Sequence, residues 1–435
     1  MPRQTETGSM PQMATEQQTD LQQYCHDTAA KAKRAASELQ LCSTESRNNW
    51  LRAAASALRD GNQVILQANA RDIEAAPQFN LTDAQIDRLR LNAERIEGIA
   101  TALEEIADLP DPIGEVISST VRPNGLDVKQ VRVPLGVVFF IYESRPNVTA
   151  DAAAICIKSG NAVILRGGKE AAHSSRAIVD LISGVAAEND IPTDAVQLVS
   201  TTDRDAVGHF LRLNDFIDVA IPRGGEGLIR RVADEATMPV IKHFEGNCHV
   251  YVDETADLNV AEKIVVNSKC QRMGVCNACE SLLVHRSIAD QAIPQITAAL
   301  AEHEIEIRGD HVTCSLVETA IEASDSDYKS EFLGPVISIK TVGSLKEAVE
   351  HINSFGSHHT DAIVTSSEDS ADYFTKAVDS SAVMVNASTR FNDGGEFGLG
   401  AEIGISTDKF HARGPCGLKE LTSYKYIATG DGHVR

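Results

Sequence analysis

Apolar residues recur at helical spacing through the first hundred residues of the chain. Three alanine-rich segments carry this pattern, at 27–39, 46–59 and 82–106. Their candidate caps are Thr28, Thr44 or Ser46, and Thr82. None of these segments contains a chemical motif, so the pattern predicts a purely helical start.

The pattern changes to short β-prone runs after Pro110 and Pro112. Residues 115–122 and 126–133 flank Pro123-Asn124-Gly125, and an Asn-Gly pair between β-prone runs predicts a hairpin. Such a hairpin is either an arm for a partner subunit or an ordinary edge hairpin.

Strands then alternate with helices along most of the remaining chain. The continuous apolar run 135–142 predicts a strand buried on both faces. Further strands are predicted at 162–166, 196–200, 216–221, 249–252, 281–285, 335–341 and 362–365, with helices at 148–158, 169–188, 203–213, 258–268 and 288–302. This alternation indicates the α/β class, with a doubly wound parallel sheet that binds ligands beyond the carboxyl ends of its strands.

The composition narrows the class of function. Among the 435 residues, 40 Lys and Arg stand against 62 Asp and Glu, and the net charge of -22 disfavours nucleic acid and anionic membranes as partners. Nine unevenly spaced cysteines do not resemble a disulfide framework, and no apolar run reaches the roughly 20 residues of a membrane span. Residues 1–20 predict a disordered extension, not a signal peptide, so we expect a cytoplasmic protein.

The stretch 271–280 is the strongest candidate for chemistry. Lys269 and Arg272 lie near Cys276 in the sequence, and positive charge favours the thiolate form that acts as a nucleophile. The alternatives are an inert buried cysteine, or a redox or metal-binding pair with Cys279. No second pair of this kind and no suitably spaced histidines accompany it, so we expect no metal site.

Two glycine turns, each flanked by basic residues, follow predicted strands. Their residues are Arg166, Gly167, Gly168 and Lys169 in the first turn and Arg223, Gly224 and Gly225 in the second. Each turn opens a helix, whose N-terminal amides can bind phosphate. Neither has Gly-x-Gly-x-x-Gly spacing, so each alone is either a phosphate loop or a tight turn. Together they predict a phosphorylated dinucleotide as ligand.

Segments spread over nearly the whole chain from about residue 20 carry a family resemblance. They are 133–137, 142–148, 158–161, 166–171, 246–253, 271–277, 357–361 and 414–423. In this order and at this spacing they resemble the gamma-glutamyl phosphate reductases, also called glutamate-5-semialdehyde dehydrogenases. These enzymes belong to the aldehyde dehydrogenase superfamily and catalyse the second step of proline biosynthesis.

The resemblance implies catalysis through a cysteine thioester. Cys276 attacks the carbonyl of L-glutamyl 5-phosphate, phosphate leaves, and the thioester is reduced with NADPH to L-glutamate 5-semialdehyde. Asn147, after the first core strand, is the candidate amide that stabilises the oxyanion, and an Asx turn is its alternative role. Arg145, His359 and Glu402 are candidate substrate-binding residues. Arg145 is equally consistent with an ion-paired loop residue, and Glu402 with a surface carboxylate.

Two differences from relatives sharpen the expected reaction, and a third concerns the cysteine loop. Oxidising aldehyde dehydrogenases hydrolyse their thioester with a glutamate in a Glu-Leu-Gly-Gly motif, where this chain has His243-Phe244-Glu245-Gly246. Lys169 aligns with a glutamate of NAD-preferring relatives, and its charge suits the 2′-phosphate of NADP. Met273 replaces the usual proline of the cysteine motif, which removes a restraint on the loop, while Gly274 is expected to meet the backbone requirement.

The resemblance also implies a division into domains. They are an NADPH-binding domain at 21–113 and 135–245, a catalytic domain at 246–400, and an oligomerisation arm and tail at 114–134 and 411–435. We therefore expect a homo-oligomer with a small-molecule substrate, and glutamate 5-kinase is a candidate docking partner. The alternative functions are another oxidoreductase of the superfamily that acts on a small acyl or aldehyde substrate, including a hydrolysing aldehyde dehydrogenase, and a non-enzymatic redox or metal-binding protein.

Overall fold

The computed structural model describes residues 10–143 and 145–435. The chain forms two compact units: residues up to Ile241 together with Gly417–Arg435, and Lys242–Cys416. We call them the first and the second unit. Each contains a parallel sheet with helices, so the predicted α/β class is confirmed. No helix in the described part of the chain is long and apolar enough to cross a membrane.

The N-terminal segment of the first unit is helical, as predicted. Its helices are α1 (Met10–Leu39), α2 (Thr44–Asp60), α3 (Asn62–Ala75), α4 (Asp83–Leu89) and α5 (Ala93–Asp108). Because α1 begins at Met10, residues 10–20 are helical where we expected a disordered extension. Residues 1–9 of that expected extension lie outside the described part of the chain.

Two of the predicted caps differ in the structure. Ser43, in place of Thr44 or Ser46, caps α2 by accepting a hydrogen bond from the N–H of Ser46. Thr28 lies inside α1 and caps no helix start. A helix therefore starts at the residue whose side-chain oxygen accepts from the first free backbone amides. The apolar pattern gives the position of that residue only approximately.

The predicted helix 82–106 is divided into α4 and α5. Thr82 caps α4, as predicted, and forms a capping box with Gln85. Asn92 then starts α5 by accepting a hydrogen bond from the N–H of Arg95 at 2.7 Å. A second N-cap inside the apolar pattern therefore ends one helix and starts another.

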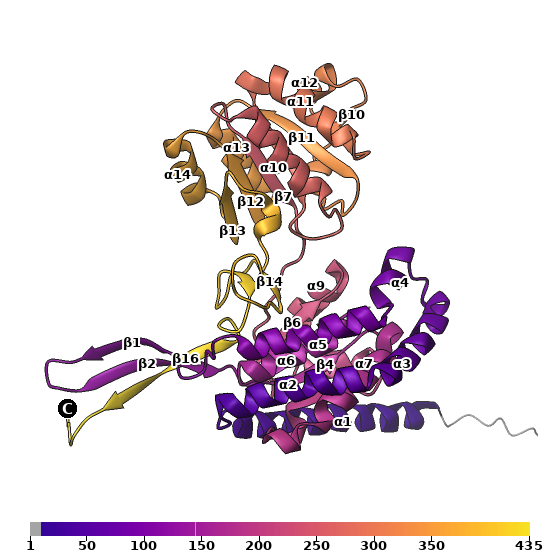
Figure 1. The fold of residues 1–435 in the computed structure, drawn as a ribbon, viewed down its shortest axis with the longest axis vertical. Coiled ribbons are helices and arrows are strands. Elements are labelled where there is room, and N and C mark those ends of the chain that lie inside the picture. Colours follow the sequence, from indigo (N-terminus) through magenta and orange to yellow (C-terminus); the bar gives the residue numbers. More distant parts are fainter. Residues whose placement is uncertain (1–9, 144) are drawn as a thin grey trace, which may run out of the picture. The chain divides into compact units, whose positions relative to one another are not determined.

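The sheet of the first unit has the order β5-β4-β3-β6, and all its strands are parallel. They are β3 (Val137–Tyr142), β4 (Ala162–Arg166), β5 (Val196–Leu198) and β6 (Val219–Arg223), and the helices that follow them are α6 (Pro146–Lys158), α7 (Ala172–Gly184), α8 (Asp205–Phe210) and α9 (Glu226–Glu235). Every residue of the central strand β3 is buried, as predicted. The chain reverses its course across the sheet after β5, so α6 and α7 cover one face and α8 the other. Figure 1 shows α2 and α5 beside α6, whereas α1 packs with α8.

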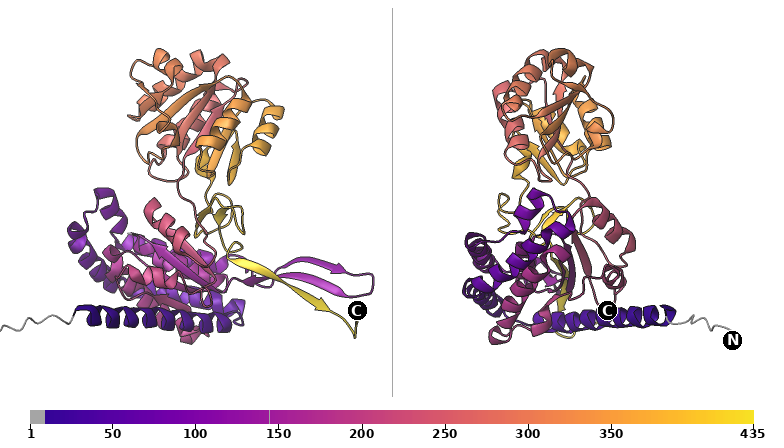
Figure 2. Two further views of the ribbon diagram at one scale, coloured as in Figure 1. Left: turned by 180° about the vertical axis from the view of Figure 1, so that it is seen from behind. Right: turned by 90° about the vertical axis from the view of Figure 1, so that its right-hand side faces the viewer.

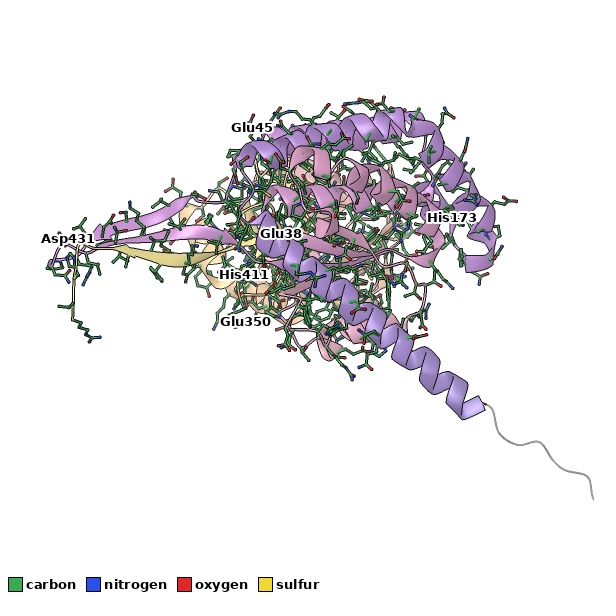
Figure 3. The ribbon with its side chains drawn as sticks, turned by 90° about the horizontal axis from the view of Figure 1, so that it is seen from below. Glu38, Glu45, His173, Glu350, His411 and Asp431 are labelled. Atoms are coloured by element: carbon green, nitrogen blue, oxygen red, sulfur yellow. The ribbon has the colours of Figure 1, made fainter. Side chains whose placement is uncertain are left out.

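The predicted hairpin is confirmed: β1 (Val116–Val121) pairs antiparallel with β2 (Asp127–Pro134). The C-terminal strand β16 (Thr422–Thr429) pairs with the other edge of β2, so a three-stranded ribbon forms. This ribbon projects from the rest of the first unit (Figures 1 and 2). Asp431 lies near its tip in Figure 3, where His433 Nε2 is 2.7 Å from the carbonyl oxygen of Asn124.

The second unit contains a parallel sheet with the order β10-β9-β11-β8-β7-β12-β13. Its strands are β7 (Cys248–Val252), β8 (Cys279–His285), β9 (Glu306–Gly309), β10 (Ile321–Glu322), β11 (Val336–Val342), β12 (Thr360–Val364) and β13 (Ala382–Val385). Its helices are α10 (Leu258–Cys270), α11 (Ala289–Ala301), α12 (His311–Leu316), α13 (Leu345–Phe355) and α14 (Glu368–Ala377), and a small sheet pairs β14 (Gly404–Ser406) with β15 (Gly414–Cys416). Val250 and Leu282 pack with α10 and α11 on one face, and Tyr251 and Leu283 with α13 and α14 on the other.

Candidate active site

Cys276 lies in the loop between α10 and β8, at the amino end of β8. His243 precedes β7 and His359 precedes β12, and β7 lies between β8 and β12 in the sheet. The three side chains therefore come from the amino ends of three adjacent strands. One potential ligand atom of each lies within 4.8 Å of the others. Cys276 is half-buried.

Hydrogen bonds fix the residue that follows the cysteine. The side-chain amide of Asn277 donates to the backbone carbonyl oxygen of Asn392 at 3.0 Å, and the backbone carbonyl oxygen of Asn277 accepts from Thr389 Oγ1 at 2.7 Å. Arg390 donates to the side-chain oxygen of Asn277 and, through Nε, to Gln271 at 2.7 Å. Arg390 therefore links the two ends of the cysteine loop, a role that no motif in the sequence indicated.

Gly246 leaves room for the backbone of Cys276. A Cβ atom built on Gly246 would overlap the carbonyl group of Cys276 and would lie 2.5 Å from its Cα. Cys248, at the start of β7, donates from Sγ to the carbonyl oxygen of Cys276 at 3.1 Å. The start of β7 and the cysteine loop are thus in direct backbone contact.

Lys269 has a different position from the one we expected. Its ammonium forms an ion pair with Glu280, and both side chains are fully buried. Glu280 also accepts a hydrogen bond from the N–H of Leu333 at 3.1 Å. Because Glu280 balances the charge of Lys269, the cations that act on the cysteine loop are Arg272 and Arg390.

The alternative, a pair of Cys276 with Cys279, is not formed. Cys279 belongs to the hydrophobic core under β8, and its Sγ donates to the carbonyl oxygen of Ser281 at 3.4 Å. Burial raises the pKa of Cys279 to about 12. All nine cysteines are free thiols. Cys279 is therefore an inert core residue, and Cys276 is the candidate nucleophile.

Two predicted substrate-binding residues, His359 and Glu402, lie in the same unit as Cys276. His359 is fully buried, with Nδ1 2.8 Å from Thr360 Oγ1. Glu402 accepts a hydrogen bond from the N–H of Gly394 at 2.9 Å and so closes the glycine-rich loop 391–402.

A carboxylate that we had not predicted lies near His359. Glu331 accepts a hydrogen bond from the N–H of Gly246, and burial raises the pKa of this carboxyl group. It is half-buried and belongs to an irregular segment before β11. No local pattern marks it in the sequence.

The predicted cofactor-binding residues lie at the carboxyl edge of the first unit's sheet. Arg166 ends β4 and Arg223 ends β6, on either side of β3, so both glycine turns lie at one edge. A cleft at this edge is lined by residues 166–169 and 198–202. The Arg166 guanidinium donates to the carbonyl oxygen of Thr202 at 3.1 Å, and the ammonium of Lys169 lies 4.9 Å from the centroid of the Phe79 ring. The cleft therefore presents fixed positive charge, which fits a phosphorylated cofactor.

Carboxylates of the chain itself occupy backbone amides at the starts of α7 and α9. At α7, buried Asp72 accepts from the N–H groups of His173 and Ser174 at 3.1 and 2.7 Å. At α9, Glu143 accepts from the N–H of Gly225 at 3.1 Å. The amides of His173 and Ser174 are thus satisfied by Asp72, a carboxylate of the chain itself, and phosphate binding at the glycine turn 166–169 stays a prediction.

Asn147 and Arg145 lie at the start of α6, after β3. The Asn147 amide donates to the carboxylate of Asp151, one turn further along α6, at 3.0 Å. Burial raises the pKa of Asp151 to about 6, and the hydrogen bond from Asn147 opposes this rise. The amide is therefore held in place by its own helix.

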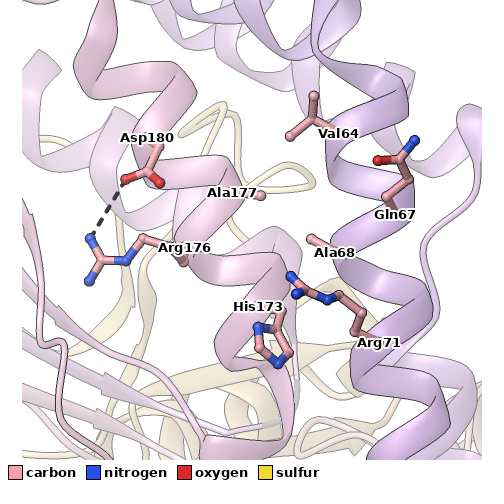
Figure 4. Close-up of a pocket in the computed structure, with 8 residues that line it drawn as sticks. All are labelled: Val64, Gln67, Ala68, Arg71, His173, Arg176, Ala177 and Asp180. Carbon is pink, nitrogen blue, oxygen red and sulfur yellow. Dashed lines mark ion pairs between the residues drawn. The ribbon is translucent and has the colours of Figure 1, made fainter.

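A second groove, of about 470 Å³, lies between α3 and α7 (Figure 4). It is lined by Val64, Gln67, Ala68 and Arg71 of α3 and by His173, Arg176, Ala177 and Asp180 of α7. Arg176, 3.6 Å from Asp180, also lines the cleft at the sheet edge. None of the predicted site residues lies in this groove.

Comparisons with known proteins agree with the resemblance. The profile of the aldehyde dehydrogenase family matches residues 9–313 and 306–427. The chain is 64% identical over 419 residues to the gamma-glutamyl phosphate reductase of Rhodopirellula baltica, a match that covers 96% of each chain. The enzyme of the same name from Carboxydothermus hydrogenoformans is 53% identical, over 94% of this chain and 98% of that one. The crystal structure of the Thermotoga maritima enzyme of that name superposes with a TM-score of 0.93 at 44% identity, over 94% of this chain and 99% of that one. This chain therefore belongs to the aldehyde dehydrogenase family and, within it, to the gamma-glutamyl phosphate reductases.

Proposed function

We propose that this chain reduces L-glutamyl 5-phosphate with NADPH to L-glutamate 5-semialdehyde and phosphate, the second step of proline biosynthesis from glutamate. The observation that carries the proposal is the 64% identity, over 96% of the chain, to a protein named gamma-glutamyl phosphate reductase. The position of Cys276 in a loop braced by hydrogen bonds supports it. A nicotinamide cofactor is common to the aldehyde dehydrogenase family.

Cys276 is the proposed nucleophile. Its thiolate attacks the acyl carbon of the substrate, and the bond from that carbon to the phosphate oxygen breaks. Phosphate departs, and the acyl group remains on Sγ as a thioester. NADPH, when bound, supplies the hydride that reduces the thioester. The carbon–sulfur bond then breaks, the aldehyde leaves and the thiolate is restored.

The proposed oxyanion donors are the backbone N–H of Cys276 and the side-chain amide of Asn147. Each such donor is typically worth about 3 to 4 kcal/mol in the transition state. An amide has two donor hydrogens, and the contact of Asn147 with Asp151 uses one. Arg145, His359 and Glu402 are proposed to contact the substrate.

The basic residues of the cleft support NADPH in preference to NADH. Lys169 is exposed and held against Phe79, and Arg166 is fixed by Thr202. Two cations at the edge where the cofactor is proposed to bind favour the extra 2′-phosphate. Gly167, Gly168, Arg223, Gly224 and Gly225 complete the proposed cofactor site.

The ribbon of β1, β2 and β16 is proposed to pair with a second copy of the chain. Both of its outer strands have unpaired edges, and Val121, Tyr424 and Tyr426 are exposed on it. Exposed apolar side chains beside a free strand edge are typical of surfaces that a partner covers.

One assay tests the proposed reaction in reverse. The chain is supplied with L-glutamate 5-semialdehyde and NADP⁺, and NADPH formation is followed with and without inorganic phosphate. We expect turnover only with phosphate, because phosphate must release the acyl group from Cys276. The variant Cys276→Ala is the control and should be inactive while remaining folded.

Two outcomes would contradict the proposal. Turnover that does not depend on phosphate indicates hydrolysis of the thioester by water, as in the oxidising relatives. Absence of turnover with a folded chain indicates a different substrate or a protein that is not an enzyme.

A further inference from the structure

We propose that His243, Cys276 and His359 form a binding site for a soft divalent metal ion, above all zinc, which reversibly blocks the nucleophile. Among the residues that the structure describes, these three place one potential ligand atom each within 4.8 Å of one another. Thiolate and imidazole are the ligands that zinc prefers. Metal binding itself needs only these side chains and does not depend on the proposed reaction.

The orientation of His243 suits a ligand. Its Nδ1 lies 2.9 Å from the carbonyl oxygen of Ile405. A carbonyl only accepts, so Nδ1 carries the hydrogen, and in the neutral ring Nε2 carries the lone pair. Histidines that bind metals commonly have this arrangement, in which one ring nitrogen donates to a backbone carbonyl and the other binds the ion.

The ring of His359 is already ordered. It is fully buried, its Nδ1 lies 2.8 Å from Thr360 Oγ1, and its centroid is 5.3 Å from that of the His243 ring in an edge-on contact. A ring that is fixed before the ion arrives loses little conformational entropy on binding. Neighbouring Glu331 adds a carboxylate near His359, which favours a cation, while Arg390 at the cysteine loop opposes it.

The distances require only a small adjustment. Zinc binds cysteine sulfur at about 2.3 Å and histidine nitrogen at about 2.0 to 2.1 Å, so tetrahedral ligands lie about 3.3 to 3.6 Å apart. The donor atoms, within 4.8 Å of one another, therefore need to approach by at most about 1.2 to 1.5 Å. Rotation of the half-buried Cys276 side chain can provide this movement. Three protein ligands leave the fourth position of zinc for water.

Metal binding and catalysis exclude each other at one sulfur atom. The thiol of Cys276 loses its proton to solvent when the metal–sulfur bond forms. The bound sulfur then shares its lone pair with the ion and no longer attacks a carbonyl carbon. Zinc should therefore compete with the acyl substrate, and a chelator should restore activity.

Cobalt(II) binding to the full chain tests the site without turnover. A thiolate bound to cobalt absorbs in the near ultraviolet, and we expect this band to saturate at one ion per chain. The band should be absent in Cys276→Ala. In His243→Asn the apparent affinity should fall by about tenfold or more, the scale seen when a metal site loses even a supporting contact.

His303→Asn is the matched control, because His303 is exposed in the turn after α11 and is not part of the cluster. It should bind cobalt as the unchanged chain does. The half-buried His243 is the residue to replace, because changing fully buried His359 risks the fold. If His243→Asn unfolds, His243→Gln gives the same comparison.

Zinc inhibition provides the second measurement. Turnover of the unchanged chain should fall with added zinc and return with EDTA, and His243→Asn should need about tenfold more zinc. The proposal is overturned if the cobalt band does not depend on Cys276, or if His243→Asn binds as tightly as His303→Asn. A failure of the proposed reaction would leave the cobalt result unchanged, so the two proposals fail separately.

Discussion

Gly246→Ala should damage the position of the nucleophile more than the stability of the fold. The new Cβ would lie 2.5 Å from the Cα of Cys276 and closer still to its carbonyl oxygen. Nonbonded carbon atoms come into contact at about 3.5 Å, so the cysteine loop or the start of β7 must move by about 1 Å. A displacement of this size costs about 100-fold in rate. Overpacking of this kind costs about 1 to 3 kcal/mol of stability.

Two quantities are measured for Gly246→Ala and for the unchanged chain. One is kcat in the direction of semialdehyde oxidation, and the other is the midpoint of urea unfolding. Gly334→Ala is the matched control in the same unit, because the nearest atom to its new Cβ is a backbone oxygen at 3.6 Å, an ordinary contact. We expect Gly334→Ala to keep both its rate and its midpoint. Full activity with an unchanged midpoint in Gly246→Ala would refute the reasoning, since it would mean that the two segments separate without consequence.

Three further predictions concern buried groups of the second unit. Cys279→Ala should retain activity and lose about 1 kcal/mol of stability, because it removes only the buried thiol group from the core. A loss of activity like that of Cys276→Ala would instead indicate that Cys276 and Cys279 act together in catalysis. Lys269→Met should cost about 3 to 5 kcal/mol in urea unfolding, because it leaves Glu280 buried and unpaired, while Lys269→Met with Glu280→Met should recover most of it. An equal loss in the double variant would show that the pair contributes more than charge balance. Burial lowers the pKa of His351 to about 3, below the roughly 6.5 of an unfolded chain. Between these values only the unfolded chain binds the proton, so stability falls with falling pH by up to about 1.4 kcal/mol per pH unit, and His351→Phe should remove this slope. Unfolding midpoints at pH 7 and pH 5 measure this change of stability with pH. If the slope persists in the variant, the titration of other groups causes it.

Strands with a local signal were predictable from the sequence. The limits predicted for β4, 162–166, agree with Ala162–Arg166, because an apolar run between Asn161 and a glycine turn has clear ends. Helix α3 gave no such signal. Its buried residues are Ile65, Asn69 and Asp72, and two of these three are polar. Asn69 donates to the carbonyl oxygen of Leu89, and Asp72 caps α7, so tertiary hydrogen bonds bury positions that a hydrophobic pattern counts as exposed.

The neighbours of Cys276 were not predictable in the same way. His243, Arg390 and Glu331 come from segments far apart in the chain. They precede or follow β7, β11 and β13, which the strand order β11-β8-β7-β12-β13 brings into one sheet with β8, and this order is not fixed by the order of the strands along the chain. The sequence also misled us about Lys269, because closeness along the chain to Cys276 does not show which carboxylate its ammonium will meet.

Tertiary contacts also explain how the cysteine loop keeps its form without the proline usual in the family. Met273, which replaces that proline, packs against the hydrophobic core of the second unit. Gly274 does not adopt a positive φ, and its part in shaping the loop stays a prediction. The loop is instead held by the packing of its Met273 side chain on the core, by the hydrogen bond from Arg390 to Asn277, and by the close approach of Gly246. A proline would restrain only one φ angle of the loop. The contacts described here instead fix the position of the loop relative to the sheet, and this position determines where Sγ of Cys276 lies.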